Sequence, residues 1–281
     1  MPGPAERLAW LADHIPALPG SGIVYTLTTR DADRVAEWLR GNGVDAHAYH
    51  SGKSDEERQA LEQALLTNGI KCLVATTALG MGYDKPDLTF VVHYQTPGNV
   101  VAYYQQVGRA GRAIPDAYGV LLSGEEEDDI NEYFRDSAFP PEWQVNRILE
   151  ALDAADEGMK VREIERAVNL RQSQIEKVLK LLVVEPQSPV MRIEGAWYRT
   201  PNPFQLDLQR IEHLTRQRES EWEQMKQYLA NERCLMAFLA DALDDASPSA
   251  CGRCAVCLGH PVLPTDVQRA TLIEAQRFVR H

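Results

Sequence analysis

The chain has 281 residues, of which 44% are hydrophobic and 25% are charged, so it is long enough for two globular domains or for one domain with appendages. No apolar run reaches the roughly 18 residues that span a bilayer, and the first six residues lack the basic region and apolar core of a signal peptide. We therefore expect a soluble cytoplasmic protein without a membrane partner. The net charge of −12 and the isoelectric point of about 5.1 argue against nucleic-acid binding through bulk positive charge, although a local basic track is compatible with them.

The first half of the chain alternates apolar segments typical of buried strands with segments typical of helices. Two helix starts are predicted from Thr28-x-x-Asp31 and from Ser54-x-x-Glu57, which have the pattern of a capping box. Strand–helix alternation predicts an α/β fold with a parallel sheet covered by helices. The predicted strands are residues 22–27, 46–50, 70–75, 88–93 and 119–122.

Polar residues follow the predicted strands, at the edge where ligands of parallel sheets lie. Hydroxyls, backbone N–H groups and helix N-termini at this edge suit contacts with phosphate. The segments concerned are residues 28–30, 50–52, 76–77 and 80–86.

Residues 105–112 read Gln-Gln-Val-Gly-Arg-Ala-Gly-Arg and place two arginines three positions apart. Each guanidinium is a planar fork of donors that matches phosphate oxygens. At this spacing we expect both side chains on one face of a helix, with the glycines allowing close approach of a backbone or a nucleotide. The alternative is an ordinary amphipathic helix with two surface arginines.

The order of these motifs resembles the second motor lobe of a RecQ-family superfamily 2 helicase, over about residues 1–135. Gly-Met-Gly at residues 80–82 and Tyr-His-x-Gly at residues 49–52 favour RecQ over the wider superfamily. Ala113 is a departure, because the family often has an acidic residue there. The resemblance implies a RecA-like lobe over residues 1–140.

The resemblance also implies roles for single residues. Arg112 is expected to be the arginine finger that reaches the γ-phosphate of ATP bound on the first lobe. Arg109 and Gln105 are expected to couple the nucleotide to the sheet, while Gly82 and Asp84 are expected on the nucleotide side of the cleft between the lobes. The residues implied to touch a DNA backbone, without reading bases, are Arg30, His50, Ser51, Gly52, Thr76 and Thr77.

Two motifs of a complete motor are absent from the sequence: the phosphate loop G-x-x-x-x-G-K-[ST] and an Asp-Glu-x-His or Asp-Glu-x-Asp run for magnesium. Both belong to the first lobe, so ATP and Mg²⁺ are expected to bind mainly there. The chain is then either a fragment of a longer helicase or a natural half-motor, and in both cases we expect no ATP hydrolysis by the chain alone.

Residues 141–203 have the pattern of three helices and a hairpin, which resembles a winged helix inserted after the lobe. We expect Ser173-x-x-Glu176 to open the third helix as a capping box, with Arg171, Gln174, Lys177 and Lys180 facing outward toward a DNA backbone or groove. Glu176 on the same helix weakens this expectation, and winged helices also serve as protein-docking modules.

The cysteines fall into two classes. Cys72 lies in an apolar strand and is expected to be a buried core thiol. The other four, Cys234, Cys251, Cys254 and Cys257, are expected to bind structural zinc, since four thiolates leave no open coordination site. A redox Cys-x-x-Cys is the alternative, but it needs neither the first nor the last of these thiols.

The spacing of the four cysteines is similar to the RecQ zinc module, in which a long helix carries the first cysteine. We expect that helix over residues 216–243, inside a helical zinc-binding module over residues 204–262. Residues 263–281 are expected to be a tail or the start of a further element. Much of the acidity, in residues 125–129 and 241–245, is expected at the solvated surface.

The leading functional hypothesis is an ATP-dependent DNA helicase of the RecQ type, a DNA-repair class of enzyme, represented by its second lobe and accessory modules. Its partners are expected to be the first lobe and DNA, as a single strand and at a duplex junction. The alternatives are a non-enzymatic DNA-binding or regulatory protein built on a half-motor and a transcription regulator. The latter leaves residues 105–112 unexplained.

Overall fold

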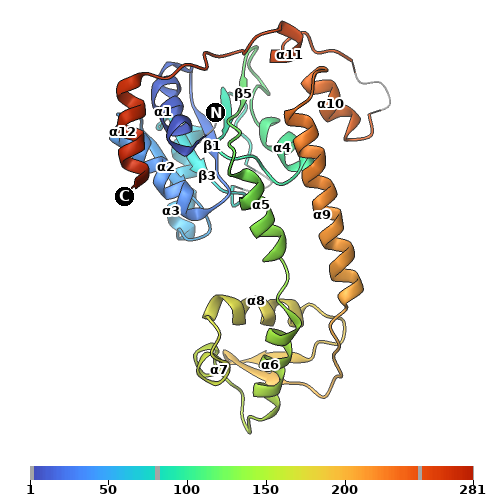
Figure 1. Ribbon diagram of the computed structural model, residues 1–281. Helices are drawn as coiled ribbons and strands as arrows, with labels where there is room; N and C mark the ends of the chain where they lie inside the picture. The colour runs from blue at the N-terminus through green and yellow to red at the C-terminus, as the bar shows by residue number, and fades with distance from the viewer. Residues whose placement is uncertain (1–2, 80–82, 246–248, 281) are drawn as a thin grey trace. The chain divides into compact units, whose positions relative to one another are not determined.

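A computed structural model describes residues 3–79, 83–245 and 249–280. The chain divides into two compact units (Figure 1). Unit 1 contains Met1–Asn131 and Ser220–His281, and unit 2 contains Glu132–Glu219. In the part of the chain described, no helix is both long and apolar enough to cross a membrane.

Unit 1 contains a five-stranded sheet in the order β2-β3-β1-β4-β5, and all neighbouring strands are parallel. This confirms the α/β prediction. The first four strands are apolar almost throughout because helices cover both faces of the sheet. The strands are β1 (Gly22–Tyr25), β2 (Ala46–Tyr49), β3 (Cys72–Ala75), β4 (Phe90–His93) and β5 (Tyr118–Leu121).

Alternate strand residues divide the core of unit 1 between the two faces. Val24, Val74 and Val92 pack with helices α1 (Pro4–His14) and α2 (Thr29–Gly41). Ile23, Leu73 and Val91 pack with α3 (Asp55–Leu66) and with the end of α4 (Val100–Val107). A short 3-10 helix, Ile15–Ala17, follows α1. Cys72 is completely buried, as predicted, and burial raises the pKa of its thiol to about 12.

Both predicted helix caps of unit 1 are confirmed. Thr28 Oγ1 accepts a hydrogen bond from the Asp31 N–H at 3.0 Å. Ser54 Oγ accepts from the Glu57 N–H at 3.2 Å, while Glu57 Oε2 accepts from the Ser54 N–H at 2.8 Å. These caps fix where α2 and α3 begin, just beyond the carboxyl ends of β1 and β2.

Residues 263–281 belong to unit 1. Helix α12 (Arg269–Arg280) lies beside α1 and α2 (Figure 1), with Ala275 buried in their shared core. The Asp13 carboxylate accepts hydrogen bonds from the Gln268 N–H at 2.6 Å and the Thr271 hydroxyl at 2.7 Å. Arg34 donates to two carbonyls in the last turn of α12. The segment is therefore packed onto the lobe.

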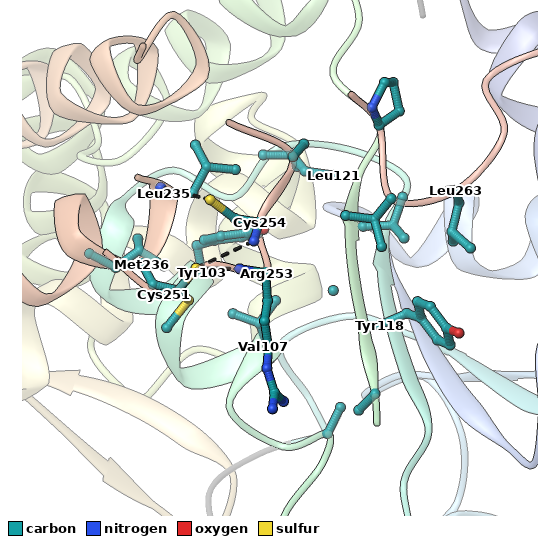
Figure 2. A pocket seen from close by; sticks show the side chains of 18 of the residues that line it. Tyr103, Val107, Tyr118, Leu121, Leu235, Met236, Cys251, Arg253, Cys254 and Leu263 are labelled. Atoms are coloured by element: carbon teal, nitrogen blue, oxygen red, sulfur yellow. Dashed lines mark hydrogen bonds between the residues drawn. The ribbon is translucent and has the colours of Figure 1, made fainter. Parts of the chain in front are cut away.

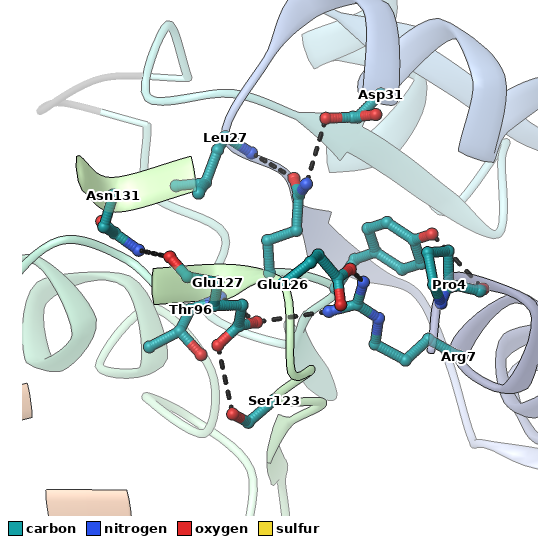
Figure 3. A network of polar contacts seen from close by, with 11 residues as sticks. Pro4, Arg7, Leu27, Asp31, Thr96, Ser123, Glu126, Glu127 and Asn131 are labelled. Carbon is teal, nitrogen blue, oxygen red and sulfur yellow. Dashed lines mark hydrogen bonds and ion pairs between the residues drawn. The ribbon is translucent and has the colours of Figure 1, made fainter. Parts of the chain in front are cut away.

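The prediction that residues 125–129 form solvated surface is wrong for two of them. Glu127 is 2% exposed and Glu126 pairs with Arg7, whose side chain is buried in α1. Figure 3 shows the network: Glu127 Oε1 accepts from Arg7 at 3.3 Å and from the Thr96 N–H at 2.9 Å, and its Oε2 accepts from Ser123 at 3.1 Å. A buried carboxylate needs such partners, and they lie far away in the sequence.

Unit 2 contains the helices α6, α7 and α8, parts of α5 (Glu127–Asp136) and α9 (Leu208–Leu229), and an antiparallel hairpin, β6 (Val190–Ile193) with β7 (Ala196–Arg199). Its core joins apolar residues of α6 (Glu142–Asp153), α7 (Val161–Val168) and α8 (Gln172–Val183). The predicted capping box at Ser173 and Glu176 is wrong by two positions. Helix α8 begins after Arg171, and Gln174 Oε1 accepts from the Arg171 N–H at 3.0 Å.

The single helix predicted over residues 216–243 is also wrong. Helix α9 (Leu208–Leu229) ends before the first clustered cysteine, and α10 (Leu235–Asp241) begins after it. Asn231 bonds the backbone of Arg233 through both ends of its amide, which competes with helical hydrogen bonding. Cys234 then caps α10, its Sγ accepting from the Ala237 N–H at 3.5 Å. The remaining helices are α5 (Glu127–Asp136) and α11 (Ala255–Leu258).

Candidate functional site

The two arginines of residues 105–112 leave a turn, and the prediction that they share one face of a helix is wrong. Helix α4 ends at Val107, and Gly108 caps it. Gly111 has φ +77°, a conformation that favours glycine and continues no right-handed helix. We call residues 108–112 the arginine turn. The two side chains therefore point to different surroundings.

Arg109 points toward the loop that follows β3. Its Nη1 donates to the Tyr83 carbonyl at 2.9 Å, and its Nη2 lies 3.5 Å from the Leu79 carbonyl. The guanidinium thus fastens the arginine turn to both ends of the segment between these residues. The predicted site residue Gly82 lies in that segment, outside the described residues.

Arg112 points outward. Its Nη1 lies 2.8 Å from Asp84 Oδ1, and the two side chains are 46% and 59% exposed. Its Nε donates to the Gly108 carbonyl at 3.2 Å. A solvated ion pair of this kind is weak, so Arg112 can exchange Asp84 for another anion at little cost.

Gln105 is exposed, whereas its neighbour Gln106 is buried. Gln106 Oε1 lies 2.7 Å from Nε2 of His93, at the end of β4. Burial lowers the pKa of His93 to about 4, so the ring is neutral at pH 7 and donates to the amide oxygen. This pair anchors α4 to the sheet. The pair was not predicted from the sequence, where its signal is a polar residue at the end of an apolar strand.

The predicted DNA-contact residues of unit 1 lie at the carboxyl ends of three neighbouring strands. Arg30 is exposed in the first turn of α2, after β1. His50 is 6% exposed and bonds Asp33 Oδ2 at 3.0 Å, and its Nδ1 accepts from the Gly52 N–H at 3.1 Å. Residues that follow β2 and β3 divide by exposure: Ser51, Gly52 and Thr77 are exposed, and Thr76 is buried.

The four clustered cysteines converge, as predicted. Their Sγ atoms all lie within 4.8 Å of one another. Backbone N–H groups point at the sulfurs: Cys251 N–H at Cys234 Sγ (3.2 Å) and Leu235 N–H at Cys254 Sγ (3.4 Å). For Cys234, burial raises the pKa, but the N–H donors of Cys251 and Ala237 outweigh it and lower the pKa to about 6.

The geometry fits a tetrahedral metal ion. Four sulfurs at about 2.3 Å from zinc lie about 3.8 Å apart, and the Sγ atoms of Cys234 and Cys254 are 4.0 Å apart. N–H donors to sulfur favour the thiolate form that a metal requires. The cluster can therefore hold one metal ion.

In unit 2, the four residues predicted to face DNA lie on α8 or at its N-cap. Arg171 is exposed at the start of the helix, and Lys180 is exposed near its end. Lys177 is half-buried, and its pKa is lowered by burial first and by the Arg218 guanidinium second. Gln174 is half-buried too, so only Arg171 and Lys180 of the residues predicted to face outward are exposed.

Known proteins match most of this chain in sequence. A family model described as the helicase conserved C-terminal domain matches residues 6–114. The ATP-dependent DNA helicase RecQ of Synechocystis sp. is 32% identical over 265 residues, which are 86% of this chain and 50% of that protein. The chain is a RecQ-like C-terminal helicase region.

Other relatives match shorter parts of the RecQ-like region. The ATP-dependent DNA helicase RecQ of Bacillus subtilis is 46% identical over 92 residues, 33% of the region and 16% of that protein. Among solved structures, a DEAD box protein from Methanococcus jannaschii is 28% identical, with a TM-score of 0.41 over 47% of the region and 36% of that chain. The region spans half the length of the Synechocystis relative.

The family match identifies the sheet of unit 1, with the helices that cover it, as the RecA-like C-terminal lobe of a helicase. Within the RecQ-like region, the arginine turn, residues 83–84 and the ends of β1–β3 all belong to this lobe. The cysteine cluster belongs to the same compact unit, although about 120 residues separate it from the arginine turn in the sequence.

Proposed function

We propose that this chain supplies the second motor lobe of an ATP-dependent DNA helicase of the RecQ type. The observation that carries the proposal is the different surroundings of the two arginine side chains in the arginine turn. Arg109 holds the turn to the loop after β3, and Arg112 is exposed beside Asp84, free to approach an anion brought by another domain. A permanent charge that is positioned yet weakly paired suits stabilisation of transferred phosphate.

In this proposal Arg112 is the arginine finger for ATP bound on the first lobe. We assign Asp84 to the nucleotide side of the cleft, together with Gln105, which is exposed in α4. ATP and Mg²⁺ are held mainly by the first lobe, which has the phosphate loop. This chain contributes charge and couples the nucleotide to the sheet.

The test is ATP hydrolysis with single-stranded DNA present, measured for the 281-residue chain and for the same chain joined to a RecQ first lobe. We expect no turnover by the chain alone and DNA-stimulated turnover by the joined protein. DNA-stimulated hydrolysis by the isolated chain would contradict the proposal. A joined protein that binds DNA without hydrolysing ATP would favour the alternative, a non-enzymatic half-motor.

We further propose that the strand ends of unit 1 contact the backbone of a DNA strand. The exposed groups there are Arg30, Ser51, Gly52 and Thr77, and their N–H, hydroxyl and guanidinium groups suit phosphate without reading bases. His50 and Thr76 are buried, so we assign them to shaping the loops. His50 does so through its bond from the Gly52 N–H.

We propose that residues 141–203 form a winged-helix-like insertion between the lobe and a zinc-binding module over residues 204–262. Support comes from the three helices, the hairpin and a bridge of two hydrogen bonds between Met159 and Trp197, which adds the segment before α7 to the hairpin. Exposed Arg171, with Lys177 and Lys180, suits a DNA backbone.

Duplex binding should depend on salt if α8 contacts phosphates. We expect Arg171→Ala to weaken duplex binding and to reduce the slope of log affinity against log salt by about 1, because one fewer cation is neutralised. Fluorescence anisotropy over a salt series measures the slope. Arg162→Ala removes an exposed arginine of α7 and is the matched control. An unchanged slope for Arg171→Ala would refute the contact and leave a protein-docking role.

We propose that the four cysteines hold structural zinc. All four donors are sulfur, which fills a tetrahedral shell and leaves no position for a substrate. Zinc there would supply a crosslink between α10, α11 and the loop between them.

A further inference from the structure

Helix α4 has two packed faces, one against the sheet and one against α9 and α10. On the sheet side, Gln106 bonds His93 at 2.7 Å. On the other side, Tyr103 is 5% exposed and packs in a core with Trp222, Met225 and Tyr228 of α9. With eight residues, α4 is too short to be stable by itself. Its position, and that of the arginine turn after it, depends on both contacts.

A continuous row of aromatic rings crosses this second contact. The ring centroids of His93 and Tyr103 are 4.9 Å apart, those of Tyr103 and Tyr228 are 5.1 Å apart, and those of Tyr228 and Phe238 are 5.6 Å apart. The side chains of Tyr103 and Tyr228 are also hydrogen-bonded to each other. Buried aromatic pairs with a satisfied hydroxyl fix orientation as well as contact.

The last ring of this row lies in α10, the helix that Cys234 of the cluster caps. Phe238 lies in α10, and its N–H donates to the Cys234 carbonyl at 3.0 Å. At the start of α10, the Leu235 N–H donates to Cys254 Sγ at 3.4 Å. An apolar pocket of about 660 Å³ is lined by Cys251 and Cys254 together with Tyr103 and Val107 of α4. Figure 2 shows these side chains around the pocket. The cysteine cluster and α4 thus line one pocket.

We propose that Tyr228 is a positioning residue for the arginine turn, through which the metal-bound cysteine cluster holds Tyr103 and α4 in place on the sheet. The effect of this positioning on phosphate chemistry rests on the proposed role of Arg112. The contacts from Tyr228 through Tyr103 to α4 do not depend on that role. It makes the geometry of Arg109 and Arg112 depend on a metal site that is distant in the sequence.

The test is hydrogen exchange of backbone amides in the purified 281-residue chain, without ATP or DNA. We expect Tyr228→Leu to raise exchange of residues 105–112 about tenfold, while amides of α2 keep their protection and the metal content stays unchanged. Tyr228→Phe keeps the ring and should restore most of the protection. Tyr104→Leu, an exposed neighbour on the same helix, is the matched control and should leave exchange unchanged.

A second measurement addresses the metal. Removing it from the wild-type chain with a chelator should raise exchange of residues 105–112 as Tyr228→Leu does. Unchanged protection there, while α10 becomes fully exchangeable, would overturn the metal link, and unchanged protection in Tyr228→Leu would overturn the role of Tyr228. A failed ATPase assay would affect the proposed function and leave these outcomes untouched.

Discussion

Replacing Arg112 with alanine is expected to lower kcat for DNA-stimulated ATP hydrolysis about 10³–10⁵-fold in a protein that joins this chain to a first lobe. The charge of Arg112 would act mainly on the transition state, so KM for ATP should change far less. Among the described residues, Arg112 pairs with exposed Asp84 and with the Gly108 carbonyl. Its loss leaves no buried group unpaired, and folding should be unaffected. Steady-state kinetics and a thermal melt measure both expectations.

The control for this prediction is Arg58→Ala, which removes an arginine of α3 that pairs locally with Asp55. It should leave kcat unchanged. Arg112→Lys keeps the charge but loses the planar fork, and we expect it to recover only part of the rate. A turnover number within tenfold of wild type for Arg112→Ala would show that another group stabilises the transferred phosphate.

The sheet was predictable from the sequence because its strands are buried on both faces. Residues 72–75 and 90–92 are continuous apolar runs, which is typical of a strand covered on both faces. Helices α2 and α3 were equally accessible, since Thr28 and Ser54 carry their own start signals within three residues. The strands and these two helices could therefore be predicted from neighbouring residues alone.

The sequence singles out the two arginines of the arginine turn but does not predict the directions of their side chains. The spacing of Arg109 and Arg112 is compatible with a helix, and nothing local shows that Gly108 ends it and that Gly111 adopts a positive φ. The consequence is functional, since one guanidinium holds a loop while the other faces solvent. Gln106 shows the same limit, because its partner His93 lies on a strand.

Contacts between distant residues were beyond sequence reasoning. An acidic run such as residues 125–129 is usually solvated, and only the fold reveals that Arg7 lies buried beside Glu126 and Glu127. The helix break before Cys234 is similar, because Ala230, Glu232 and Arg233 favour a helix while the sulfur is needed at a helix cap. Tertiary demands outweigh propensity at both places.

Cys254→Ser is expected to lower tightly bound zinc from about one ion per chain to about none and to unfold the α10–α11 segment. Cys254 does more than supply one ligand atom. It caps α11, and its sulfur accepts hydrogen bonds from the N–H groups of Leu235 and Cys257. Structural zinc is worth about 10–16 kcal/mol in small peptides. Here the sheet has its own core, so we expect the cysteine-bearing segment to unfold at a lower temperature than the sheet. Metal analysis and hydrogen exchange measure the two effects.

Cys72→Ala is the matched control, because it removes the only cysteine outside the cluster. Cys72 is the first residue of β3 and is completely buried, so the substitution should lower the melting temperature of the sheet while zinc content stays unchanged. The two variants therefore separate a thiol that packs from a thiol that binds. If Cys254→Ser kept its zinc, three sulfurs would suffice and the tetrahedral assignment would be wrong. If it lost zinc but kept protection of α10, the backbone N–H donors to sulfur, rather than the ion, would organise the segment.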